Sequence, residues 1–123
     1  TDKDFETPLG NAECDREFVN DLNAQMGKRI LNEQTAHKNE HSIEFAAILC
    51  QMFDELRTAR IVPILCGGFW ESLRARRTPE DTQPEVRDFI AALRETTQKH
   101  EANARKIGFI ASVDGAHVGT QFG

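Results

Sequence analysis

The sequence predicts an α/β domain in which a parallel or mixed sheet is flanked by helices. Two apolar runs rich in β-branched residues, at residues 61–66 and 107–113, are typical of strands buried on both faces. A helical pattern over residues 84–100 lies between them, and this order is typical of a right-handed parallel crossover. The 123 residues are enough for one domain and too few for two.

A turn and a capped helix are expected at the start of the chain. Residues 8–10 (PLG) combine the residue types that favour a tight turn. Asp15 is placed to cap a helix over residues 16–31, because apolar side chains recur there at four-residue spacing. Residues 32–40 are almost entirely polar, so we interpret them as a loop.

The next helix is expected to lie in the interior. Ser42 can cap it, and residues 43–56 are apolar on nearly every side, so the helix should be largely buried. In the predicted strand at 61–66, Pro63 cannot donate a ladder hydrogen bond and favours an edge position or a bulge. We interpret residues 71–83, which are polar and charged, as a mobile surface loop.

The last predicted helix has a suitable start, face and end. Pro84 fits the first turn of a helix, where its missing N–H has no partner to lose. Lys99 and His100 lie near the C-terminal end, where cations favour the helix dipole. One face is apolar and consists of Val86, Phe89, Ile90 and Leu93.

Composition excludes several classes of protein. The net charge of -5 comes from interleaved signs, so no nucleic-acid partner is expected. No apolar run approaches the roughly 18 residues of a membrane helix, so no membrane partner is expected either. The three cysteines lack C-x-x-C spacing, which indicates neither a disulfide framework nor a cysteine zinc site and favours the cytoplasm. We interpret Cys66 as a buried small hydrophobe rather than a nucleophile.

Residues 37–41 (HKNEH) match H-x-x-E-H, the signature of inverted zinc peptidases. On a helix, His37 and His41 would lie one turn apart and share a metal, with Glu40 beside them as a base. A zinc helix must bury one face to hold its ligands, and residues 32–41 have almost no apolar side chains. We therefore interpret His37 as a solvated loop histidine and keep a zinc hydrolase as the less favoured alternative.

His41 has two open interpretations. It lies between Glu40 and Glu44 at the start of the predicted buried helix, and flanking carboxylates can orient an imidazole and raise its basicity. His41 is then a catalytic candidate, and the two glutamates are candidates for lining a substrate pocket. In the alternative, the acidic residues only favour the positive end of the helix dipole, and the ring packs or bonds to the backbone.

Residues 112–119 (SVDGAHVG) form the second candidate segment. They follow the predicted strand at the edge where parallel sheets bind their ligands, which makes Asp114 and His117 catalytic candidates. Gly115 and Gly119 allow tight turns and a close approach of a ligand. In the alternative, Asp114 caps a following turn and His117 has no role.

The chain resembles the Memo-like family, of the type of protein B of the AmmeMemoRadiSam system, in four segments that occur in order. They are TPLG at 7–10, EHSIEF at 40–45, IVPILCG at 61–67 and SVDGAHVG at 112–119. The family is related in fold to class III extradiol ring-cleaving dioxygenases. The chain begins without an initiator Met or a signal peptide, so we expect residues 1–123 to form the central part of one Memo-like α/β domain.

The resemblance implies roles for the candidate residues. His41 would face a pocket for a small-molecule or peptide ligand and polarise a bound oxygen, while His117, beside Asp114, would move protons. HKNEH would then be a loop entering a helix, and its match to the zinc signature a coincidence. One departure concerns Asp114, which the family usually has directly after Ser, whereas here Val113 intervenes.

A second departure concerns the metal. The family's ligands lie upstream of TPLG and downstream of the Asp-x-x-His loop, so we expect non-haem iron, copper or zinc in the complete protein and none in this chain. The complete form would be a metal-dependent oxidoreductase, and the chain alone would be inactive. Exposed strand edges would favour self-association. The alternative function is a protein-interaction module whose vestigial pocket serves as a peptide groove.

Overall fold

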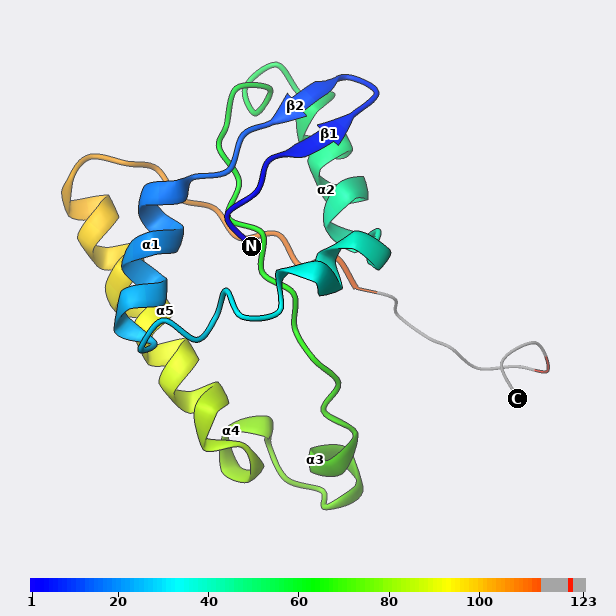
Figure 1. Ribbon diagram of the computed structural model, residues 1–123, viewed down its shortest axis with the longest axis vertical. Helices are drawn as coiled ribbons and strands as arrows, with labels where there is room; N and C mark the ends of the chain where they lie inside the picture. Colours follow the sequence, from blue (N-terminus) through cyan, green and yellow to red (C-terminus); the bar gives the residue numbers. More distant parts are fainter. Residues whose placement is uncertain (114–119, 121–123) are drawn as a thin grey trace.

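The computed structural model describes residues 1–113 and residue 120 (Figure 1). It begins with a hairpin in which β1 (Phe5–Thr7) pairs antiparallel with β2 (Gly10–Ala12). The hairpin turn confirms the turn predicted for residues 8–10. Gly10 has a φ of +113°, a conformation that L side chains rarely adopt.

Helix α1 (Arg16–Gln25) begins where the sequence predicts. Asp15 Oδ1 accepts a hydrogen bond from the backbone N–H of Phe18 at 3.1 Å, which confirms Asp15 as the cap. The helix ends before the predicted residue 31, because Gly27 adopts a left-handed backbone with φ of +64° and closes the helix in the manner of a C-terminal glycine cap.

The second helix is shorter and more exposed than predicted. A 3₁₀ helix, η1 (Gln34–Asn39), occupies the predicted loop, and α2 (Ser42–Gln51) follows it. His41, and not Ser42, holds the N-cap position of α2. The prediction that this helix is largely buried is wrong for the described structure, because its large apolar side chains face away from the hairpin that it packs on.

The predicted strand at residues 61–66 does not form. Ile61 makes one parallel bridge with Cys14, and its backbone N–H donates to the carbonyl of Glu13 at 2.8 Å. The pairing goes no further, since Pro63 has no N–H to donate to a ladder. Cys66 is exposed, so its interpretation as a buried side chain is also wrong.

The second predicted strand, residues 107–113, also lies outside regular structure and is mostly exposed. The expected parallel crossover is therefore wrong for the described part of the chain, where the sheet is the two-stranded antiparallel hairpin. The combination of helices with a small sheet nevertheless agrees with the predicted partial α/β domain.

Two short helices, α3 (Trp70–Arg74) and α4 (Pro79–Thr82), occupy the segment predicted to be a loop. They are joined by a hydrogen bond between the hydroxyls of Ser72 and Thr82. The long helix α5 (Pro84–Ala102) then begins at Pro84, as predicted, and carries Lys99 and His100 in its last turn.

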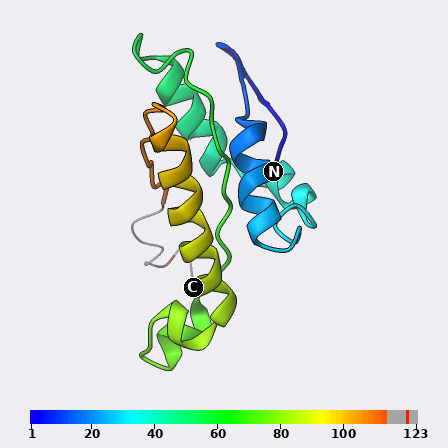
Figure 2. The same ribbon diagram turned by 90° about the vertical axis from the view of Figure 1, so that its left-hand side faces the viewer.

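Helices α1 and α5 lie side by side and enclose the core (Figures 1 and 2). The cluster of buried core residues consists of Phe18, Leu22, Met26 and Ala92. Partly buried Phe89, Leu93 and Ile107 extend this core.

Within residues 1–113 and 120, no helix has the length and apolarity needed to cross a membrane.

Candidate functional site

His41 lies on the surface at the first turn of α2. Its carbonyl accepts a hydrogen bond from the backbone N–H of Phe45 at 3.0 Å, which ties the residue to the helix. The imidazole centroid is 6.3 Å from the Phe45 ring centroid, and the two planes are tilted by 31°. The side chain is exposed, so a ligand can reach the imidazole at the positive end of the helix.

Glu40 is engaged by the start of the same helix. Its Oε1 accepts a hydrogen bond from the backbone N–H of Ser42 at 2.9 Å. Hydrogen bonds from Ser42, first from its backbone, lower the pKa of Glu40. Glu40 therefore satisfies an otherwise unpaired N–H at the helix start, while Glu44 lies half-buried in the first turn.

The two candidate segments approach each other at this point. Ser112 Oγ donates a hydrogen bond to the carbonyl of Ser42 at 2.8 Å. Figure 1 shows the segment after α5 running to the N-terminal end of α2. The first residue of SVDGAHVG thus meets the residue that follows His41. Asp114 and His117 lie outside the described residues.

His37 lies in η1 and is half-buried, so its interpretation as a solvated histidine is wrong. Its ring is edge-on to Phe5, with centroids 6.3 Å apart. Its Nε2 is 3.4 Å from the amino nitrogen of Thr1. Burial lowers the pKa of the His37 imidazole, and the positive charge of the amino group acts in the same direction.

The backbone does not form the helix that a zinc peptidase motif requires. Glu40 has an extended conformation, with φ of −114° and ψ of 122°, and separates η1 from α2. His37 and His41 therefore lie on different helices. In the part of the chain that the structure describes, no three His, Cys, Asp or Glu side chains lie close enough to share a metal, so these residues do not fit a metal centre.

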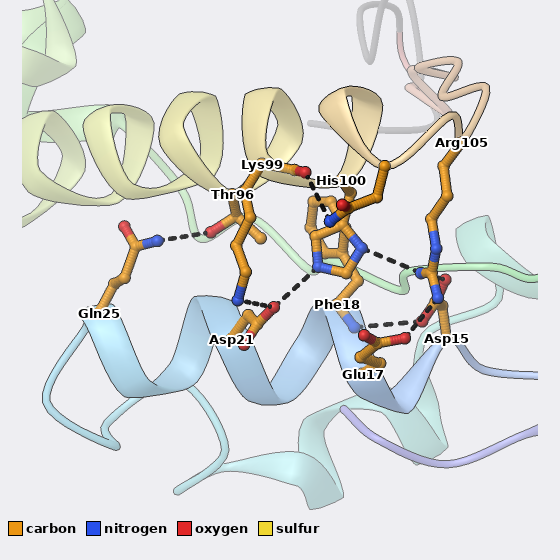
Figure 3. Close-up of polar contacts among 10 residues, drawn as sticks. Asp15, Glu17, Phe18, Asp21, Gln25, Thr96, Lys99, His100 and Arg105 are labelled. Atoms are coloured by element: carbon orange, nitrogen blue, oxygen red, sulfur yellow. Dashed lines mark hydrogen bonds and ion pairs between the residues drawn. The ribbon is translucent and has the colours of Figure 1, made fainter.

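A polar network between α1 and α5 was not predicted (Figure 3). His100 is only 2% exposed. Its Nδ1 is 3.0 Å from Arg105 Nη1, and its Nε2 is 2.9 Å from Asp21 Oδ2. An arginine can only donate, so Nδ1 accepts, and Nε2 carries the proton that it donates to Asp21. The imidazole also packs 4.9 Å from the ring of Phe18.

Further ion pairs complete the network. Lys99 Nζ lies 2.7 Å from Asp21 Oδ2, and the pKa of Asp21 is lowered, mainly by this contact and then by His100. Arg105 donates to Asp15 at 2.7 Å and also to Glu17. The network therefore joins the first two turns of α1 to the end of α5 and to Arg105 just beyond it. The sequence predicts only a helix-dipole role for Lys99 and His100, because their pairing depends on helices that are distant in sequence.

Two shallow hollows lie elsewhere on the surface. One, of about 510 Å³, lies along α5 beside Phe109, and another, of about 320 Å³, lies between the hairpin and the end of α2. Neither hollow is lined by Glu40, His41 or Glu44. Neither hollow is therefore the pocket predicted at His41.

Comparison with known proteins decides the family. The sequence model of the Memo-like protein family matches residues 1–123. This chain belongs to the Memo-like family. A MEMO1 family protein of Aquifex aeolicus (strain VF5) is 32% identical over 121 residues, which are 98% of this chain and 27% of that relative. The MEMO1 family protein MJ0403 of Methanocaldococcus jannaschii is 38% identical over 115 residues, which are 92% of this chain and 34% of that relative.

The match confirms the Memo-like resemblance that the four sequence segments indicated. The chain spans between about a quarter and a third of the length of these Memo-like relatives. No solved structure matches it.

Proposed function

We propose that this chain supplies one polar wall of a ligand pocket in a Memo-like protein. The observation that supports the proposal is the hydrogen bond of 2.8 Å between Ser112 and Ser42, because it brings the start of SVDGAHVG to the residue beside His41. These are the two segments that carry the Memo-like resemblance most specifically. In this proposal His41, Asp114 and His117 are the functional groups of the wall.

The proposed ligand is a small molecule with an acidic oxygen, such as a catechol. At the start of α2, an oxygen anion would be stabilised by the helix dipole and by an N–H of His41. His117 would accept or donate the ligand proton, and Asp114 would orient it. Glu40 would stay ionised and hold the first turn in place, since its carboxylate already accepts from Ser42.

The proposed reaction of the complete protein is a metal-dependent oxidation, related to extradiol ring cleavage. Non-haem iron, copper or zinc would supply the redox or Lewis-acid chemistry when bound. Residues 1–113 and 120 do not fit such a metal, because His37 and His41 lie on different helices and no three His, Cys, Asp or Glu side chains there lie close enough to share a metal. We therefore assign the metal ligands to the parts of the longer relatives beyond the matched segment.

Histidine NMR can test the proposed pocket. The four histidines give separate imidazole signals that His→Gln variants assign. On titration with 4-nitrocatechol, the signals of His41 and His117 should shift with one common saturation curve, while buried His100 serves as an unchanged reference. His41→Gln should abolish the shift of His117. Separate saturation curves, or shifts of His117 that survive in His41→Gln, would contradict a shared pocket.

Metal analysis tests the alternative zinc hydrolase. Inductively coupled plasma mass spectrometry of the purified chain, His37→Ala and His41→Ala should find no stoichiometric metal. One equivalent of zinc that is lost with either histidine would restore the zinc hydrolase and remove the proposal made here. Tight binding of 4-nitrocatechol would in turn count against the peptide groove of an interaction module.

A further inference from the structure

An apolar stripe on α2 faces away from the other described residues. Its four side chains are between 57% and 64% exposed. Phe45 and Leu49 lie one turn apart on α2, while Met52, the C-cap residue, and Phe53 follow directly after the end of the helix. This set, called the α2 stripe below, consists of Phe45, Leu49, Met52 and Phe53.

The opposite face of α2 is buried, although burial of its side chains stabilises the fold less than burial of the large apolar side chains would. It presents Ala47 and Gln51 to the hairpin. The Gln51 carboxamide accepts from Thr7 Oγ1 at 2.6 Å and donates to the carbonyl of Gly10 at 3.2 Å. Burial of large apolar side chains is the dominant favourable term in folding. A helix that buries Ala and Gln and exposes large apolar side chains is therefore built to be covered on both faces.

The lengths of the relatives indicate what covers the stripe. The matched segments are only 27% and 34% of these two Memo-like proteins, so most of each chain lies outside the match. We propose that the α2 stripe is the docking surface for this remaining part of the Memo-like chain, which presents apolar side chains to it. The proposal concerns packing and is independent of the ligand or reaction of the pocket.

The two methionines of the chain give a test with an internal control. Met52 lies in the α2 stripe and is 64% exposed, whereas Met26 lies in the core and is 7% exposed. This chain would be co-expressed with the parts of MJ0403 that flank its matched residues, and the purified complex would be treated with hydrogen peroxide. Mass spectrometry of methionine sulfoxide should show oxidation of Met52 slowed about tenfold relative to the chain alone, diluted until it sediments as a monomer, with no change at Met26.

Two matched leucine variants make the test specific. Leu49→Asp places a charge in the stripe, and Leu73→Asp places one on the similarly exposed Leu73 of α3. Both side chains are exposed, so both isolated variants should keep the circular dichroism of the parent. Leu49→Asp should abolish co-purification with the flanking parts, and Leu73→Asp should retain it.

Four outcomes would overturn the proposal. The first is that no complex forms, and the second is a complex in which Met52 is oxidised as fast as in the chain alone. The third is equal retention of both leucine variants. The fourth is a discrete dimer of this chain that protects Met52 and that the flanking parts do not displace. The dimer would assign the stripe to a second copy of the chain.

Discussion

His100 is held between groups of opposite charge. Asp21 accepts from one ring nitrogen and Arg105 donates to the other, while the ring itself lies against Phe18. Because both nitrogens are used and the side chain is buried, the neutral imidazole fits this position without an unpaired polar atom. The residue therefore stabilises the contact between α1 and α5 and has no access to a ligand.

His100→Ala should lower the free energy of unfolding by about 2–4 kcal/mol. The substitution leaves a cavity beside Phe18 and removes a hydrogen-bond partner from both Asp21 and Arg105. Urea denaturation measures the change. Lys99→Ala is the control, and it should cost less than about 1 kcal/mol because its ion pair is largely exposed. Equal losses for the two variants would contradict the central role of His100.

Asp21 should make the free energy of unfolding depend on pH in the acidic range. Its pKa is lowered in the folded protein, first by Lys99, so the folded state binds a proton less readily than the unfolded state. The stabilisation is present above the ordinary Asp pKa of 3.8 and is lost as the pH falls through the lowered value. Urea unfolding from about pH 2 to 6 should show a smaller loss in Asp21→Asn than in the parent. Identical pH dependence in both proteins would refute this assignment.

Among the elements, the helices were easier to predict than the strands. The Asp15 cap and the Pro84 start are local signals, and both hold in the structure. A strand depends on a partner that is distant in sequence, and the apolar run at 61–66 has only the single bridge at Ile61. The periodicity of a segment reports its preference for burial, but it does not report which other segment covers it.

The start of α2 offers a prediction at this scale. Glu40→Ala removes the carboxylate that accepts from the backbone N–H of Ser42, so the first turn should fray. Hydrogen exchange followed by NMR should show faster exchange of the Ser42 amide. Glu44→Ala is the control, since Glu44 occupies the same turn without bonding that amide. If the Ser42 amide exchanges equally fast in the parent and in Glu40→Ala, Glu40 does not cap the helix.

Across the whole molecule, the sequence identified the family, whereas the candidate site stays a prediction. Four segments in order indicated a Memo-like protein, and the comparisons confirm it. The contact between Ser112 and Ser42 joins two of these segments, whereas the roles of Asp114 and His117 stay predictions. Residue types give the chemistry of a site, but its distances depend on how remote segments pack.

The isolated chain should self-associate, for a different reason from the one expected at first. The described sheet is only a short hairpin, so copies of the chain should associate through the apolar α2 stripe rather than through strand edges. Sedimentation velocity should show a sedimentation coefficient that rises with concentration. Leu49→Asp should weaken this rise and Leu73→Asp should leave it unchanged. A monomer at all concentrations would rule out this association.

The side-chain amide of Gln51 couples the hairpin to α2 during local unfolding. From the last turn of α2 it forms hydrogen bonds with both strands of the hairpin, so the hairpin and α2 cannot separate without breaking both bonds. The hairpin and α2 should therefore unfold locally as one cooperative unit, while α1 and α5, joined through His100 and Arg105, form a second unit. Amide exchange in mild denaturant should accordingly fall into two groups of opening free energies, with the boundary near residues 13–15.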